Sequence, residues 1–416
     1  MKLPKYSMGV GDRFGRQGAA QLAAFLKVRS LGVEVAPVWN KSNREHVICG
    51  TTPDSVRTEA DSAVRKLGWN GAYFVDADHV GLKTVDPFLK AGDFFTLDVA
   101  DFIGKPAGED AVRAFAGRYS RYARELKIPG AGGILAVTPD DIGAIARKYL
   151  LAVREASAIY RRISAGKGQA PFVIEVSMDE ADSPQSPVEM LFILAAIAEE
   201  KIPAQTIAPK FTGRFNKGVD YAGDIPRFES EFKQDIAVLA FAAAEFGLPA
   251  DLKLSVHSGS DKYSLYRPIR RALKAANAGV HLKTAGTTWL EEVCGLARSG
   301  GDGLKLAVEI YRIALSRYDE MVAPYLAVID IARDRLPAAE TVDRWTAEEF
   351  VGALHHDRRN PCYDPGFRQL IHVGYKVAAE LGGRYLDALE RNAAVIGPKV
   401  TENILERHLK PLFIES

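Results

Sequence analysis

Eight short strand-type runs, separated by segments with helical periodicity, constrain the fold of this chain more than any other feature. Several of the runs are nearly continuous apolar stretches, as expected for strands of a parallel sheet that are buried on both faces. The predicted strands cover residues 6–10, 33–39, 72–79, 94–99, 171–180, 206–211, 252–257 and 280–284. Eight strands alternating with helices predict an α/β fold, a closed (β/α)8 TIM-type barrel. An open doubly wound sheet fits the same pattern, because alternation along the chain does not establish closure.

Two regions exceed what a minimal barrel needs. A long insertion follows the fourth strand, and its residues 108–166 are predicted to be mostly helical, with a break at the turn 129–133. After Trp289 most of the chain has helical character. We therefore predict a catalytic barrel domain over residues 1–290 and a helical C-terminal extension, packed on the barrel, over residues 291–416.

Composition limits the classes of function. The chain is 47% hydrophobic and 26% charged with a net charge of +1, so no strong global field favours nucleic acid or a membrane surface. Cys49, Cys294 and Cys362 show no CxxC spacing, which predicts neither a disulfide framework nor a structural zinc knot. The start lacks the apolar core of a signal peptide, and no apolar segment is long enough to span a bilayer. A cytoplasmic protein is expected.

Polar residues recur on one face of the predicted strands, opposite the apolar face. In a barrel, active groups lie at the C-terminal ends of the strands and in the loops that follow, so these residues predict a mouth lined by ionisable groups. The third strand ends in Asp76, Asp78 and His79. On the later strands the polar face carries Asp98, Glu175, Ser177, Asp179, Lys210, Ser255, His257, His281 and Lys283.

Three histidines, His79, His257 and His281, lie at or within the third, seventh and eighth strands. Imidazoles are common ligands of zinc, manganese, iron and nickel, and three ligands with one open position are typical of a catalytic metal site. We therefore predict that this trio binds a divalent metal. His355 and His356 are a weaker pair, because adjacent residues on a helix diverge by roughly 100°.

Asp78 and Glu175 are the candidate acid and base, because burial and a neighbouring cation can set two carboxylates at different pKa values. Asp76 lies deeper and is expected to orient a ligand or to pair with a lysine. Cations at other strand ends (Arg13, Lys41, Lys210 and Lys283) are candidates for binding an anionic substrate. The stretch His257–Lys262, which includes Ser258, has the small residues and the cation of a phosphate or carboxylate cradle. No GxGxxG or GxxxxGK[ST] motif follows a strand, so a dinucleotide or P-loop site is not expected.

Five stretches in chain order carry a resemblance to a known family: GVGDRFG at 9–15, FVDADHVGL at 74–82, IEVSMDE at 174–180, SVHSGSDK at 255–262 and HLKT at 281–284. Together they resemble the tagaturonate/fructuronate epimerases of hexuronate catabolism. The resemblance runs from about residue 9 to about residue 290, and the later tail is matched only by its helical character.

This resemblance implies an isomerase that epimerises C4 of a 2-keto hexuronate with a divalent metal, which could be zinc, manganese, nickel or cobalt. It implies that Asp78 is the proton acceptor, Glu175 the proton donor, and His79, His257 and His281 the metal ligands. Lys210, Lys283 or Arg13 would hold the substrate carboxylate. The expected partners are a small sugar acid and further copies of the chain in a homo-oligomer.

Two other functions stay open at this point. A metal-dependent ketose epimerase or a class II-type aldolase acting on a phosphorylated sugar would use the 257–262 loop to hold phosphate. A non-catalytic sugar-acid-binding protein is the other, although so many ionisable strand ends argue against it.

Overall fold

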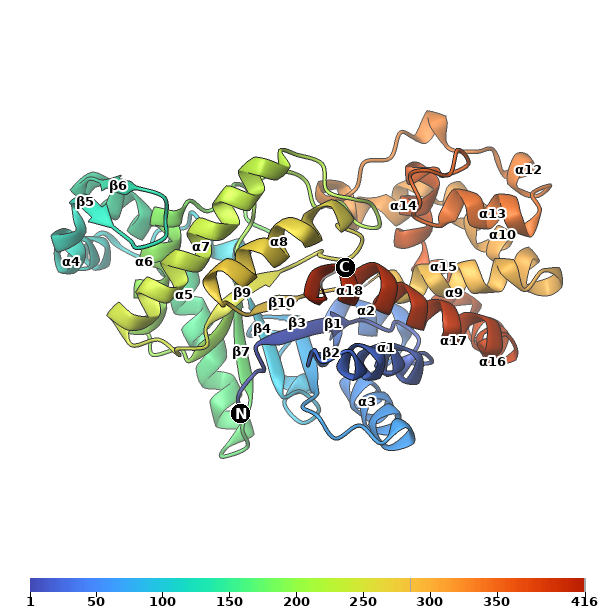
Figure 1. Cartoon of the computed structure of the whole chain (residues 1–416), viewed down its shortest axis with the longest axis horizontal. Helices are drawn as coiled ribbons and strands as arrows, with labels where there is room; N and C mark the ends of the chain where they lie inside the picture. Colours follow the sequence, from blue (N-terminus) through green and yellow to red (C-terminus); the bar gives the residue numbers. More distant parts are fainter. Residues whose placement is uncertain (285, 415–416) are drawn as a thin grey trace.

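The computed structural model describes residues 1–284 and 286–414, and its centre is a closed barrel of parallel strands (Figure 1). The strands are β1 (Tyr6–Val10), β2 (Ala36–Ser42), β3 (Phe74–Val80), β4 (Phe94–Asp98), β7 (Val173–Ser177), β8 (Ala204–Ala208), β9 (Lys253–Val256) and β10 (Val280–Leu282). Their order around the barrel is β1-β10-β9-β8-β7-β4-β3-β2. Because β1 pairs with both β2 and β10, the ring is closed. The predicted barrel is confirmed, and the open sheet is excluded.

Helices surround the barrel and follow its strands. They are α1 (Gly18–Ser30), α2 (Asn43–Cys49), α3 (Pro53–Leu67), α5 (Pro139–Lys167), α6 (Pro187–Glu199), α7 (Ile225–Phe246), α8 (Tyr263–Ala276) and α9 (Thr287–Arg298). Local sequence sets several of their ends. Ser186 and Glu189 form a capping box at the start of α6, and equivalent boxes start α2 and α5. At the C-terminal end of α3, Gly68 adopts a left-handed conformation that ends the helix.

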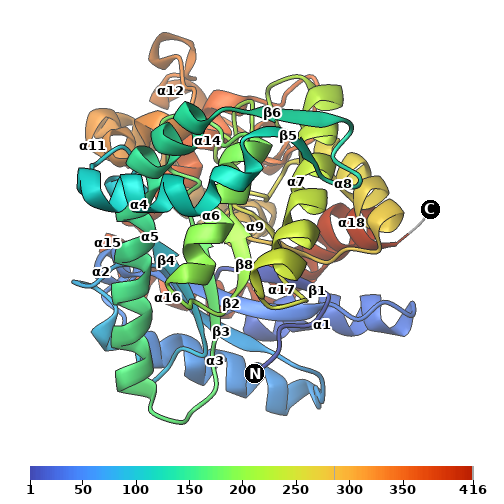
Figure 2. The same ribbon diagram turned by 90° about the vertical axis from the view of Figure 1, so that its left-hand side faces the viewer.

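The insertion after β4 contains a small hairpin in addition to the predicted helices. It contains the short turns η2 (Ala100–Phe102) and η3 (Ser120–Tyr122), the helix α4 (Glu109–Tyr119), and an antiparallel pair, β5 (Arg124–Lys127) and β6 (Ile134–Val137). A further short turn, η1 (Asp86–Phe88), lies between β3 and β4. The stretch 108–166 is mostly helical, as predicted, and the hairpin is an additional element that the sequence did not predict. The predicted turn at 129–133 is the loop of this hairpin. Figures 1 and 2 show the hairpin beside α4, and Figure 1 places both at the opposite end of the molecule from the C-terminal helices.

After α9 most of the described chain up to residue 413 is helical, as predicted. The elements are α10 (Gly301–Ser316), α11 (Tyr318–Val322), η4 (Ala323–Val328), η5 (Arg333–Arg335), α12 (Ala339–Val342), α13 (Ala347–Leu354), α14 (Pro365–Val373), α15 (Tyr375–Leu381), α16 (Gly383–Arg391), α17 (Ala393–Glu402), the π-helical η6 (Asn403–Leu409) and α18 (Lys410–Phe413). α17 and η6 return to pack against α1 and α9 on the barrel. Within the described ranges, no helix combines the length and the apolar character that crossing a bilayer requires.

A small apolar cluster fills the barrel interior at the N-terminal ends of the strands. Four strands contribute their first residue to it, so it closes this end of the barrel. Its members are Leu3, Ala36, Val38, Phe74, Phe94 and Val173. The larger apolar core lies between the sheet and the surrounding helices. Buried ionisable side chains such as Asp76, Glu175 and Lys283 lie toward the opposite end of the barrel, where the strands finish.

Candidate active site

The inward faces of the strands change from apolar to polar toward their C-terminal ends. On β3, β4 and β7 the apolar first residue is followed two positions later by Asp76, Thr96 and Glu175. Thr96 and Glu175 are register partners on adjacent strands, and the Thr96 hydroxyl lies 3.2 Å from Glu175 Oε1. These side chains therefore form one buried layer above the apolar cluster. The polar face predicted from the period-two pattern is confirmed for these strands.

Lys283, just after β10, is the cation at the centre of this layer. Its Nζ lies 2.8 Å from Asp76 Oδ2, 2.7 Å from Asp78 Oδ1 and 3.3 Å from Glu175 Oε1. It also donates a hydrogen bond to the hydroxyl of Thr96 at 2.5 Å. All of these groups are buried. One ammonium thus holds three carboxylates from two strands within reach of each other.

The three carboxylates hold protons unequally. Burial raises the pKa of Asp76 to about 7, against the opposing effect of Lys283. Burial also disfavours the Asp78 anion, but Lys283 and His79 outweigh it and lower the pKa to about 2. For Glu175, burial is opposed by Lys283 and His257, which hold its pKa well below the usual range. Asp78 and Glu175 are therefore anions at neutral pH, so neither carries a proton to donate.

His79 reaches the same site because β3 is irregular at this point. Its φ of 53° lies in the left-handed region, and the register between β3 and β4 shifts between Ala77 and Val80. Side chains alternate along a regular strand, so Asp78 and His79 would point to opposite faces. The bulge instead places the His79 ring 5.0 Å from the ring of His257, with its Nε2 3.6 Å from Asp78 Oδ1.

His257, at the end of β9, bridges two carboxylates of β7 and the loop after it. Its Nε2 lies 2.6 Å from Glu175 Oε1, and its Nδ1 lies 3.1 Å from Asp179 Oδ1. Burial would lower the pKa of His257, but Asp179 and Glu175 raise it. In the same way Asp78 and Asp98 overcome burial and raise the pKa of His79 to about 10. Both imidazoles therefore lie in a strongly anionic environment.

His79, His257 and Asp179 form a group that could hold a metal ion. One ligand atom from each lies within 4.8 Å of the others. Two imidazoles and a carboxylate are a donor set used by zinc and other transition metals. His79 Nδ1 is buried and makes no hydrogen bond within the described structure. The carboxylates of this region also outnumber its lysine, so a divalent cation would balance their charge. The donor set fits a metal.

The other predicted histidine, His281, lies apart from this group. It sits within β10, with its Nδ1 2.9 Å from the Ser7 hydroxyl and its ring 5.2 Å from that of Phe94 in the apolar cluster. Burial lowers the pKa of His281 to about 3, so its imidazole is neutral. The structure thus brings together two of the three predicted ligands and adds Asp179. Asp179 was assigned to the polar face of its strand from sequence but was not singled out as a ligand.

The predicted anion cradle after β9 has a different geometry. Lys262 donates from Nζ to the carbonyl oxygens of Asn216, Val219 and Ser260 at 2.8, 2.8 and 3.0 Å, and burial lowers its pKa to about 8. Ser258 is half-buried with a φ of 48°. The N–H groups of Lys262 that a phosphate would need are therefore already donated to backbone carbonyls, and these hydrogen bonds connect the loops around it.

Arg13 is also engaged within the protein. Its Nε lies 3.2 Å from Glu45 Oε1, its Nη1 donates to the His372 carbonyl, and its guanidinium lies 3.9 Å from the Tyr375 ring centre. Lys210 is half-buried and donates to the carbonyl of Ala181. Within the described residues, Lys210 makes no ion pair. Lys41 and Lys262 likewise make no ion pair there, but both are buried and bonded to backbone carbonyls, whereas Lys210 is half-buried.

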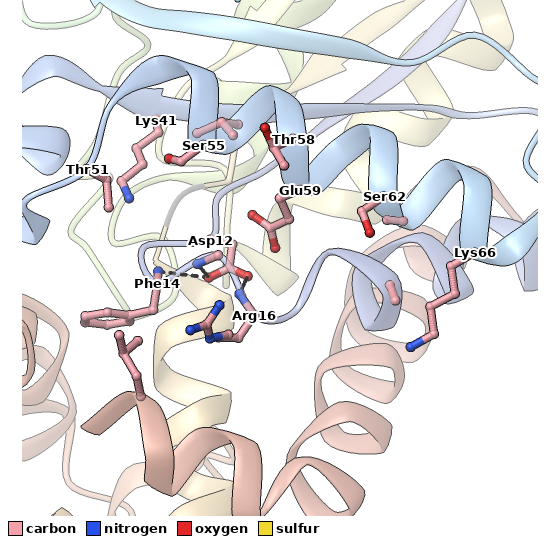
Figure 3. A pocket seen from close by; sticks show the side chains of 15 residues that line it. Asp12, Phe14, Arg16, Lys41, Thr51, Ser55, Thr58, Glu59, Ser62 and Lys66 are labelled. Carbon is pink, nitrogen blue, oxygen red and sulfur yellow. Dashed lines mark hydrogen bonds between the residues drawn. The ribbon is translucent and has the colours of Figure 1, made fainter. Parts of the chain in front are cut away.

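Lys41 lines a separate cavity of about 600 Å³ between α1, α3 and α16. Figure 3 shows Lys41 there with Asp12 and Glu59. Lys41 Nζ donates to the Arg13 carbonyl at 2.6 Å, and Asp12 accepts four backbone N–H groups of residues 14–17. This cavity shares no lining residue with the Lys283 cluster. Its polar groups hold the loop after β1 in place.

Sequence reasoning missed Asn40. Asn40 is 2% exposed on the inward face of β2, in register with Asp76 on β3. Neither polar atom of its side-chain amide finds a hydrogen-bond partner within the described structure. A buried amide without partners is costly, so it is suited to contact a polar ligand. The available signal was its place two residues after Val38 on the same strand face.

The sequence profile of the tagaturonate epimerase family matches residues 1–385. The chain belongs to the tagaturonate epimerase family. All the residues of the barrel site described above lie within the matched range, and membership makes the protein an epimerase, an enzyme of the isomerase class.

The chain is also similar to individual epimerases. A tagaturonate/fructuronate epimerase from Thermotoga maritima is 29% identical over 421 residues, covering 97% of this chain and 80% of the relative. Crystal structures of a fructuronate-tagaturonate epimerase from Cohnella laeviribosi share the fold. The complex with one glycerol superposes with a TM-score of 0.81 at 24% identity, over 98% of this chain and 81% of that one. The native form gives a TM-score of 0.77.

Proposed function

We propose that this protein interconverts D-tagaturonate and D-fructuronate, which differ in configuration at C4, at the mouth of the barrel. The family match supports the substrate class. The observation that carries the proposal is the position of Lys283, whose ammonium gathers Asp76, Asp78 and Glu175 beside His79 and His257. Such a site would offer proton acceptors, a fixed cation and metal ligands within one buried cluster.

We further propose that His79, His257 and Asp179 hold a divalent cation, with zinc, manganese, nickel and cobalt as the candidates. When bound, the cation supplies Lewis-acid stabilisation of negative charge on substrate oxygens. The hydrogen-bonded carboxylate of Glu175 orients the His257 ring, as outer partners of metal-bound histidines do.

The proton chemistry then falls to the carboxylates. C4 is β to the ketone, so enolisation does not make its own hydrogen acidic. Asp78 takes the proton of the C4 hydroxyl. The oxygen lone pair becomes the C4 aldehyde, and the electrons of the C3–C4 bond pass into the enediolate of the other fragment. After the aldehyde rotates, the bond re-forms on its other face and the proton returns to the oxygen. The step is a retro-aldol cleavage followed by an aldol closure, with no net change in atoms.

Glu175 and Lys283 complete the proposed machinery. Glu175 is an anion in the structure, so it donates a proton only after accepting one, for example by exchange with Asp78 across Lys283. The half-buried Lys210, which makes no ion pair within the described residues, is the cation that we assign to the substrate carboxylate. Asp76, with its pKa raised to about 7, is suited to hold a proton in a hydrogen bond at neutral pH.

A rival mechanism removes the C4 hydrogen directly with Asp78 and replaces it with Glu175. The two mechanisms predict different deuterium content in the product. Turnover in deuterium oxide leaves C4 unlabelled under the retro-aldol mechanism, whereas direct deprotonation places solvent deuterium at C4. Mass and NMR analysis of the product distinguishes them.

The test of the function itself is turnover of tagaturonate by the purified protein, followed by NMR before and after chelation and after adding back each of the four metals. Fructuronate that forms only with metal is the expected result. Absence of conversion with any of them would refute the assignment of substrate and leave the barrel fold unaffected. Inhibition by phosphate, with turnover of a phosphorylated ketose, would favour a ketose epimerase or class II-type aldolase that acts on a phosphorylated sugar.

A further inference from the structure

A second group of metal-ligand side chains lies outside the barrel, where α9 packs against α13 in the C-terminal helical region (Figure 1). Glu291 and Cys294 are three residues apart on α9 and so lie on the same face of that helix. His355 is the residue that ends α13. One ligand atom from each lies within 4.8 Å of the others. We propose that Glu291, Cys294 and His355 bind a thiophilic divalent cation of the zinc class.

The burial of this triad supports a built site rather than a surface cluster. Glu291 is 2% exposed and Cys294 is 3% exposed, while His355 is half-buried. Within the described residues, the Glu291 carboxylate accepts a single hydrogen bond, from the amide of Asn403 at 2.9 Å. A carboxylate is costly to bury with one neutral partner, and a metal ion would compensate its charge.

Arg407 is the cation that now occupies the edge of the triad. Its Nη1 lies 3.0 Å from Nε2 of His355, and its Nη2 donates to the carbonyl of His356. Its guanidinium also lies 4.5 Å from the ring centre of Tyr263. These other contacts hold Arg407 in place when its hydrogen bond to the imidazole is given up to a metal.

The donor set separates this site from the one in the barrel. A thiolate, an imidazole and a carboxylate with a fourth position for water fit tetrahedral zinc, and the sulfur disfavours magnesium, calcium and manganese. The barrel group has no sulfur. Cysteine spacing predicted no zinc knot, because such knots use pairs of cysteines close in sequence. This triad instead combines one cysteine of α9 with a histidine that is far from it in sequence. A bound ion would cross-link the first helix after β10 to the C-terminal helices.

Cobalt(II) tests the proposal, because thiolate ligation produces a ligand-to-metal charge-transfer absorption that nitrogen and oxygen ligands do not. Metal-free protein carrying His257→Ala is titrated with cobalt, so that the barrel group is disabled. We expect the thiolate band to appear and to saturate at one cobalt per chain. Absence of the band, in this variant and in the wild type, would overturn the proposal.

Variants locate the sulfur. Cys294→Ser abolishes the band, whereas Cys49→Ser and Cys362→Ser, the matched controls, retain it. Since Cys294 is buried, His355→Gln provides a second variant at a half-buried position, and it weakens cobalt binding by about tenfold or more while leaving the circular dichroism spectrum unchanged. A band that survives Cys294→Ser, or an affinity unaltered by His355→Gln, would place the metal elsewhere.

Discussion

The Nζ of Lys283 lies 2.7 Å from Oδ1 of Asp78 across the interior of the barrel. Lys283 directly follows β10 and Asp78 lies on β3, and these two strands are separated in the ring by β1 and β2. The ion pair therefore joins opposite parts of the wall, and the barrel must be closed for it to form. It also fixes the proton acceptor and the cation of the proposed chemistry relative to each other.

Lys283→Met should destabilise the fold and abolish turnover. Removing the ammonium leaves Asp76, Asp78 and Glu175 as buried carboxylates without their cation, which costs about 3–5 kcal/mol in the free energy of unfolding. Urea denaturation measures this loss. Lys210→Met, at a half-buried lysine that makes no ion pair within the described residues, is the control and should cost about 1 kcal/mol or less. Equal effects of the two substitutions would contradict the central role of Lys283.

Asp179→Asn and His281→Gln distinguish the group found in the structure from the histidine trio expected from sequence. Asp179 lies beside His257, whereas His281 is bonded to Ser7 deeper in the barrel. Asp179→Asn should weaken binding of the activating metal by about tenfold or more, and His281→Gln should weaken it less. Calorimetric titration of metal-free protein gives both affinities. The reverse order would restore His281 as a ligand in place of Asp179.

Protonation of Asp261 should lower the free energy of unfolding of the protein in acid. Arg368 Nη2 lies 2.8 Å from Asp261 Oδ2, with both side chains 1% exposed. Burial would raise the pKa of Asp261, but Arg368 and His356 hold it well below the usual range. A carboxyl whose folded pKa is depressed contributes stability above its unfolded pKa of about 3.9, and the contribution is lost as the pH falls through the folded value.

Asp261→Asn should therefore destabilise the protein by about 3–5 kcal/mol at pH 7, and by progressively less below about pH 4. The free energy of unfolding of variant and wild type, measured across this range, checks the sign. Asp302→Asn, at an exposed carboxylate on α10, should show the same dependence of unfolding free energy on pH as the wild type. A gap between variant and wild type that stays constant with pH would show that charge is not the cause.

Asn40→Leu should raise stability while lowering activity. It replaces a buried amide that lacks partners with an apolar side chain of similar size, which should increase the free energy of unfolding by about 1 kcal/mol. Because the amide would lose its contact with the substrate, kcat/KM should fall about tenfold or more. A tenfold fall corresponds to about 1.4 kcal/mol of lost transition-state stabilisation. The exposed Asn70→Leu is the control for activity. A stabler variant with full activity would show that Asn40 does not contact substrate.

The sequence alone determined the barrel strands and, on β4, β7, β9 and β10, which face carries the polar groups. Each of the predicted strands overlaps a strand of the barrel, and Glu175, His257 and Lys283 lie in the same site. These features are readable because alternation of side chains is local: two residues along a strand always return to the same face. The hairpin β5–β6 was missed because its short strands do not show that alternation clearly.

Tertiary structure decided which of these inward residues meet. The bulge in β3 turns His79 to the face of Asp78, and depth along the barrel separates His281 from His257. Lys262 looks like a ligand-binding lysine in sequence, but loops from distant segments supply the carbonyls that bind it. Bulges, the stagger of strands and loop contacts depend on how the whole ring closes, so no local pattern encodes them.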